Sequence, residues 1–180
     1  MSIQFDSTNA DCFVLTYKDG ALSALAHDLK LQVTRFEVDI DVTARSIKAI
    51  FDARSIHVVG ACKCGVSVPG VLSPRDIKEI EENIERYVIK SEVNPAIRFE
   101  SSQVKEEGDG FGVVGVLFLH GRSKELRFSV CSEGARLIAR VGLHQPDFGI
   151  RPFSTMFGTL KIKPDVVVQI SLPAPQLCMR

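Results

Sequence analysis

Alternation of apolar and polar side chains runs through most of this chain and constrains its fold more than any other feature. An alternation with period two places every second side chain on one face of a β-strand. Turn sequences such as Glu106–Gly110 and Ser132–Gly134 separate several of these segments, and their glycines supply the positive φ that tight reversals need. Short reversals join antiparallel neighbours, so the pattern predicts an all-β, antiparallel fold. The candidate strands are Cys12–Lys18, Asp28–Val33, Phe36–Val42, Ile47–Ala53, Ala96–Val104, Phe111–His120, Glu125–Cys131, Ala135–Leu143 and Val166–Leu172.

One segment departs from the alternation and predicts a helix. Ser73 is a helix-capping residue, Pro74 suits the first helical position, and acidic residues follow near the positive end of the helix dipole. Apolar residues then recur at steps of three or four, at Ile77, Ile80, Ile84 and Val88. We expect an amphipathic helix over about 74–90 that lays its apolar stripe on the outside or the mouth of the sheet, as a lid or plug.

Two strand segments are apolar on both faces, Val113–Leu119 and Val166–Val168. One face would pack against the interior, and we expect the helix or a second subunit to cover the other. A closed sheet of about eight strands can be filled by its own side chains or can enclose one small ligand. The pattern leaves both alternatives open.

Composition and charge exclude several classes of partner. Lysine plus arginine and aspartate plus glutamate number 22 each, so no net charge attracts nucleic acid. No apolar stretch approaches the roughly 18 residues that cross a bilayer. The amino terminus lacks a secretory signal, so we expect a cytoplasmic protein with reduced cysteines. Residues 1–172 are expected to form one domain, followed by a frayed tail over 173–180.

Histidine side chains suggest a metal or acid/base site, because imidazole ligates metals and titrates near neutrality. His27, His120 and His144 lie far apart in the sequence without local ligand spacing, and Cys62 and Cys64 have no second ligand pair nearby. No nucleophile elbow, phosphate-binding glycine loop or zinc-protease motif occurs. The sequence therefore predicts no metal, no cofactor and no catalytic residue, with a histidine-dependent enzyme as an alternative.

An unusual segment, Arg151–Gly158, combines one charge with three large apolar side chains. The Arg151 guanidinium can bind a phosphate or carboxylate, while Phe153, Met156 and Phe157 line a tunnel for an apolar tail. A plug that binds no ligand is the alternative.

Four segments resemble a known family. Phe51–Ile56, Asn94–Ser101, Gly115–Lys124 and Asp147–Ile150 are similar, in order, to motifs of the YceI-like family. The resemblance covers about residues 1–172. It implies an eight-stranded antiparallel β-barrel of lipocalin-like shape, one amphipathic helix between the early and middle strands, and an apolar tunnel for long isoprenoid chains. Family members often occur as dimers, so a homodimer stays open here.

The resulting hypothesis is non-catalytic binding, transport or sequestration of a hydrophobic small molecule: a polyprenyl phosphate, a quinone or a fatty amphiphile. A homodimeric interaction domain with a packed barrel is the alternative. The candidate ligand-binding residues are His27, Phe99, Phe118, His120, His144, Phe148, Arg151, Phe153, Met156 and Phe157.

Overall fold

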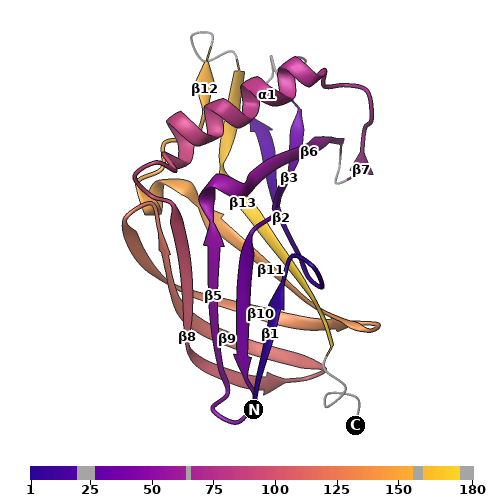
Figure 1. The fold of residues 1–180 in the computed structure, drawn as a ribbon, viewed down its shortest axis with the longest axis vertical. Helices are drawn as coiled ribbons and strands as arrows, with labels where there is room; N and C mark the ends of the chain where they lie inside the picture. The colour runs from indigo at the N-terminus through magenta and orange to yellow at the C-terminus, as the bar shows by residue number, and fades with distance from the viewer. Residues whose placement is uncertain (20–26, 64–65, 156–159, 175–180) are drawn as a thin grey trace.

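A computed structural model describes residues 1–19, 27–63, 66–155 and 160–174 of the chain, and these residues form a curled antiparallel sheet with one helix across its end (Figure 1). The strands follow the order β1-β4-β5-β8-β9-β10-β11-β13-β2-β3-β6-β7, and β12 pairs with β13. Their bounds are β1 Ser2–Asp6, β2 Asp11–Asp19, β3 Asp28–Val33, β4 Phe36–Asp41, β5 Ser46–Asp52, β6 Ile56–Lys63, β7 Val66–Ser67, β8 Ala96–Glu107, β9 Gly110–Leu119, β10 Arg122–Glu133, β11 Arg136–His144, β12 Ser154–Thr155 and β13 Leu160–Pro173.

All nine predicted strands are present, but the expected eight-stranded barrel is wrong. Twelve strands form a linear path that ends at β1 and β7. The described strands therefore form a curled sheet with two ends, whereas a barrel would be closed. The sequence pattern missed β1, β6, β7 and β12. Strand β6 breaks the alternation because its register with β3 shifts between Lys30 and Leu31, and such a bulge displaces every later side chain by one position. Strands β7 and β12 are two residues long, too short for a periodic signal.

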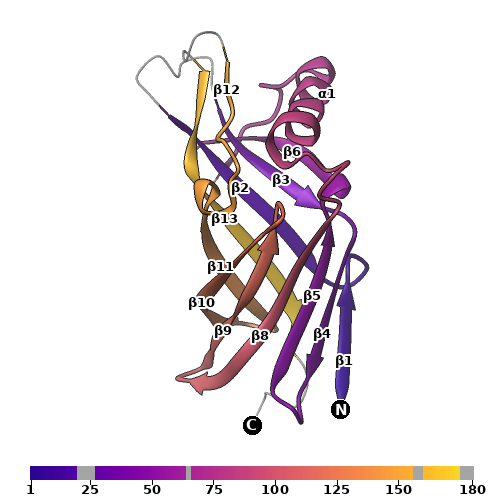
Figure 2. The same ribbon diagram turned by 90° about the vertical axis from the view of Figure 1, so that its left-hand side faces the viewer.

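A bent hairpin joins the two halves of the sheet. Strand β3 continues into β4 through residues 34–35, and β5 continues into β6 through the 3₁₀ turn η2 (Ala53–Ser55). Because β3 pairs with β2 while β5 pairs with β8, the same hairpin contacts both halves, and the sheet curls around an interior (Figure 2).

Hydrogen bonds of Ser55 fix this bend. Its side chain is fully buried, its Oγ donates to the Asp52 carbonyl at 2.7 Å, and the same Oγ accepts from the Arg35 N–H at 3.0 Å. Burial raises the pKa of Asp52, but hydrogen bonds from Arg54 and the charges of Arg54 and Arg35 outweigh it and hold that pKa below its usual value. A charged Asp52 therefore reinforces the turn.

The predicted helix is confirmed as α1 (Pro74–Asn83), which continues as a π-helical segment, η3 (Ile84–Ile89). Ser73 Oγ accepts from the Asp76 N–H at 3.2 Å, and the Asp76 carboxylate accepts from the Ser73 N–H at 2.8 Å. This reciprocal pair satisfies two donors at the helix start. The Ser73 hydrogen bonds also hold the pKa of Asp76 below its ordinary value.

The helix covers the end of the sheet rather than the outer face of β9 (Figures 1 and 2). We name this the helix end, and the opposite end, at the β4–β5 turn, the hairpin end. Phe118, on the outer face of β9, keeps 50% of its surface exposed. The expectation that the helix covers this face is therefore wrong, and cover by a second subunit stays a prediction.

Part of the expected tail, 175–180, lies outside the described residues. Pro173 belongs to β13, and the Ala174 N–H donates to the Ala135 carbonyl at 2.8 Å, so the sheet extends past the predicted boundary at residue 172.

Replacing Ser55 with alanine is expected to lower the free energy of unfolding by about 1–3 kcal/mol, because the Arg35 N–H would lose its acceptor inside the bend. Denaturant unfolding followed by circular dichroism measures this. The control Ser123→Ala lies on an exposed part of β10 and should stay within about 0.5 kcal/mol of wild type. Equal losses in the two variants would contradict the role given to Ser55.

Candidate functional site

A cavity of about 1180 Å³ occupies the interior of the curled sheet. Ligand pockets for drug-sized molecules span about 300–1000 Å³. This cavity therefore has room for a larger molecule than those pockets usually take.

Inward-facing positions of the strands form its wall, and they are overwhelmingly apolar. On β2 these are Cys12, Val14 and Thr16, the alternate set to the outward-facing residues. Alternation with period two places these residues on one face of the strand, where they are turned to the interior. The other apolar wall residues of the strands include Leu29, Leu31, Val38, Ile40, Ala49, Phe51, Ile97, Leu117, Leu126, Val141, Val166, Val168 and Ile170.

Phe99 and Phe128 meet across a glycine in this wall. Both rings line the cavity, with centroids 5.6 Å apart. Gly115 of β9 lies between their strands, and a Cβ at Gly115 would come within 2.5 Å of the Phe99 ring. The missing side chain at residue 115 therefore makes room for the predicted site residue Phe99.

At the helix end, α1 and η3 contribute Ile80, Ile84, Val88 and Ile89 to the lining. No residue of either segment is fully buried. The apolar stripe thus lines the cavity at the end of the sheet, one of the two positions that the amphipathic pattern predicted, and its last residues, Val88 and Ile89, also pack against the core.

The segment after β11 completes the helix end. Phe148, in the 3₁₀ turn η4 (Gln145–Phe148), is 1% exposed and lines the cavity, as do Arg151 and Phe153. His27, just before β3, lines it as well. The structure therefore brings His27, Phe99, Phe148, Arg151 and Phe153 to one cavity, whereas Met156 and Phe157 lie outside the described residues.

Three predicted residues, Phe118, His120 and His144, do not line this cavity. Phe118 points outward. His120 sits in the β9–β10 turn with φ of 52°, and its Nδ1 lies 3.2 Å from the Phe148 carbonyl oxygen. This contact, with Nδ1 as the donor, holds η4 against the turn, so His120 acts on the cavity through the position of Phe148.

His144 lies at the end of β11 with its Nδ1 2.8 Å from an Asp165 carboxylate oxygen. His27, His120 and His144 thus occupy three separate surroundings and do not share a site. Across the described part of the chain, no group of three or more His, Cys, Asp or Glu side chains is placed to hold a metal ion. The ligand-binding roles of all ten candidates stay predictions.

An ion pair also holds the segment that contains η4. The Lys124 ammonium pairs with the Asp147 carboxylate, which holds the pKa of Asp147 below its usual value. Gly149 follows with φ of 69°, and a Cβ there would come within 2.8 Å of the Arg122 side chain. The Asp147–Ile150 motif is therefore a docking element that seats Phe148 at the cavity.

Sequence reasoning missed the charged residues at the hairpin end. Asp41, Arg45 and Glu106 line the cavity there, and Arg45 Nη2 lies 3.4 Å from Glu106 Oε1. The hairpin β4–β5 and strand β8 bring them together from positions 61 residues apart. No local motif could have shown this, although alternation does identify inward residues such as Val14.

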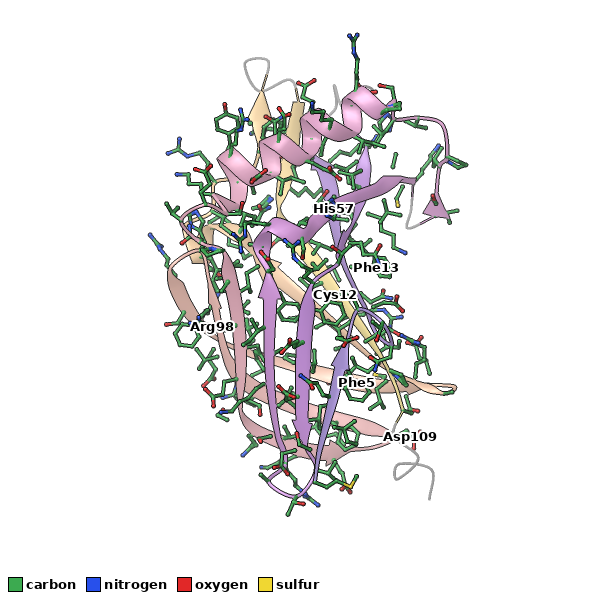
Figure 3. The ribbon with its side chains drawn as sticks, viewed as in Figure 1. Phe5, Cys12, Phe13, His57, Arg98 and Asp109 are labelled. Atoms are coloured by element: carbon green, nitrogen blue, oxygen red, sulfur yellow. The ribbon has the colours of Figure 1, made fainter. Side chains whose placement is uncertain are left out.

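Cys12 is the one thiol among the described residues that lines the cavity. Burial raises its pKa to about 12. A thiol with such a pKa stays protonated at neutral pH and is a poor nucleophile. Figure 3 labels Cys12 within the body of the sheet.

The cavity is suited to the non-covalent burial of an apolar molecule. Charged residues line the cavity at both of its ends. No helix among the described residues has the length and apolar character to cross a membrane.

Comparison with known proteins agrees with this geometry. The crystal structure of BcnA from Burkholderia cenocepacia is similar with a TM-score of 0.64 and 14% identity, covering 94% of this chain and 99% of that one. A polyisoprenoid binding domain from Saccharophagus degradans, implicated in plant cell wall breakdown, is similar with a TM-score of 0.57 and 12% identity, covering 97% and 98%. At such identities the likeness shows the fold.

Among curated proteins, comparison by sequence gives no match. The model of the family described as YceI-like domain matches residues 3–174, nearly the whole chain. The chain belongs to the YceI-like domain family.

Proposed function

We propose that this protein binds a long isoprenoid or a similar amphiphile without catalysing a reaction, holding the apolar tail in the cavity. The single observation that carries the proposal is the 1180 Å³ cavity lined by apolar side chains. Burying apolar surface contributes roughly 25 cal/mol per Å², so a chain that fills such a wall gains substantial binding free energy. The similar Saccharophagus degradans domain binds polyisoprenoids, which supports the same ligand class.

The polar head group belongs at the helix end in this proposal. Among the residues that the structure describes, Arg45 and Arg151 are the arginines that line the cavity. Arg45 at the hairpin end is already paired with Glu106, whereas Arg151 forms no ion pair with any residue the structure describes. This guanidinium and His27 line the same cavity, and the guanidinium suits a phosphate or another anionic head, because arginine binds such groups through two parallel hydrogen bonds.

The alternative of a barrel filled by its own side chains disagrees with a cavity of about 1180 Å³. The homodimer of that alternative stays a prediction. On the outer face, Ile50 and Phe118 are each about half exposed (51% and 50%), and they flank Arg98, with which each of them pairs.

Filling part of the cavity should weaken binding. Ala139 faces the cavity from β11, and Ala139→Phe places a ring in the space of the tail. The affinity for a long-chain polyprenol should fall about tenfold or more, which corresponds to roughly 1.4 kcal/mol. Ala96→Phe, the same change at an exposed position of β8, is the matched control.

Equilibrium binding in detergent solution, with the ligand identified by mass spectrometry after organic extraction, makes this measurement. Wild-type affinity in the Ala139→Phe protein, with the variant folded by circular dichroism, would overturn cavity binding.

The head-group assignment has its own test. Arg151→Gln should weaken binding of a long-chain polyprenyl phosphate about tenfold, because a hydrogen bond to a charged group contributes about 1.5–3 kcal/mol. Binding of the matching uncharged polyprenol should change less than twofold. Arg98→Gln, on the outer face of β8, should leave both ligands unaffected. Equal losses for the phosphate and the alcohol would place the head group elsewhere.

A further inference from the structure

Helix α1 and its continuation η3 are held unequally at their two ends. The C-terminal end is fixed to the sheet: Val88 and Ile89 pack against the core, and Ser91 is fully buried. The Asn94 amide donates to the Ile89 carbonyl at 3.4 Å, and the Ala53 N–H donates to the Pro95 carbonyl at 2.8 Å. These contacts join the end of η3 to the bend of the sheet.

The N-terminal end is held more weakly: among the described residues, the last backbone hydrogen bond to the sheet before the helix runs from the Val68 N–H to the Ala61 carbonyl of β6, at 2.9 Å. Residues 73–76 are exposed, and Val71 before them is 37% exposed although it lines the cavity. The described residues show one hydrogen bond from α1 to the sheet: Glu81 Oε1 accepts from the Val58 N–H of β6 at 2.8 Å. His57 Nδ1 lies 3.5 Å from the same oxygen, and Figure 3 shows His57 beneath α1.

Strand β6 makes this contact available because it lies near an end of the sheet. It pairs with β3 on one side, and on the other it pairs with β7 only at Cys62 and Lys63. The Val58 N–H would otherwise point from a bare strand edge. Glu81 therefore replaces a neighbouring strand at one position.

We propose that α1 is a lid that opens from its N-terminal end, with the Glu81–Val58 hydrogen bond as its latch, and that the ligand enters and leaves between α1 and β6. The proposal rests on the proposed function. The hinge lies where α1 passes into the π-helical η3 at Ile84, because Val88 and Ile89 further along are anchored to the core. Ile80 and Ile84 face the cavity, so a bound tail completes the surface against which the lid closes.

The test compares Glu81→Ala with Glu82→Ala. Both replace a glutamate of α1 by the best helix former, so intrinsic helix propensity changes equally. Glu82 pairs only with Lys78 on the same helix, 3.9 Å away, among the described contacts. Glu81→Gln adds a variant of nearly unchanged size whose amide oxygen is a weaker acceptor.

Two measurements are made on each protein. The first is hydrogen exchange of the Val58 amide by NMR without ligand. We expect exchange about tenfold faster in Glu81→Ala, an intermediate rate in Glu81→Gln, and a rate within about twofold of wild type in Glu82→Ala, since the lost acceptor is charged. The second is the rate at which bound all-trans-retinol, a fluorescent isoprenoid alcohol, dissociates into lipid vesicles. We expect the same order of variants, with dissociation about three- to tenfold faster in Glu81→Ala.

Faster Val58 exchange with unchanged retinol release would overturn the lid and leave the proposed function standing. Unchanged Val58 exchange would overturn the latch. Failure of the wild-type protein to take up retinol or any polyprenol would overturn the proposed function, and the lid with it.

Discussion

The buried hydrogen bonds of Ser55 are the interaction on which the rest of this structure depends. They hold the bend at which β3 passes into β4 and β5 into β6. Through that bend one hairpin pairs with β2 in one half of the sheet and with β8 in the other. A straight hairpin could pair with only one of them, and the sheet would have no enclosed interior. The low pKa of Asp52 keeps a charged acceptor at the same turn.

Curvature then explains why the interior stays hollow. A strongly curled sheet turns one apolar face inward, and opposite walls stand too far apart for their side chains to fill the space between them. The small side chains of Ala49 and Ala139 further reduce the volume that the protein itself supplies. An apolar hollow of this kind suits the long amphiphile of the proposed function, because the wall that would contact it is already formed. The proposed function therefore depends on the volume that the core leaves unfilled.

Particular residues show how far sequence reasoning reached. Alternation located nine strands, and Ser73 with Pro74 located the helix, because both signals depend on neighbours within a few residues. Of the predicted ligand-binding residues, Phe99, Phe148, Arg151, Phe153 and His27 line the cavity, and their binding roles stay predictions. Phe118, His120 and His144 do not line it. These residues lie in or beside motifs that form turns and hold segments together, as the contact of His120 with the Phe148 carbonyl shows. A motif does not reveal which of its side chains face inward. The strand number was also wrong, since a bulge and two-residue strands leave no periodic trace.

By itself, the sequence determined the elements: which segments are strands, where the helix starts, and which side chains share a face. These follow from local backbone geometry and from the periods of strand and helix. Only the tertiary structure decided that the inward rows surround an unfilled space and that Arg45 meets Glu106 at one end, while Arg151 at the other end has no ion pair with any described residue. It also decided that α1 contacts the edge of β6 through Glu81. The reason is physical: cavity volume and long-range contacts depend on the curvature and register of the whole sheet. Both arise from the pairing of segments that are distant in the sequence, so no short stretch of chain reveals them.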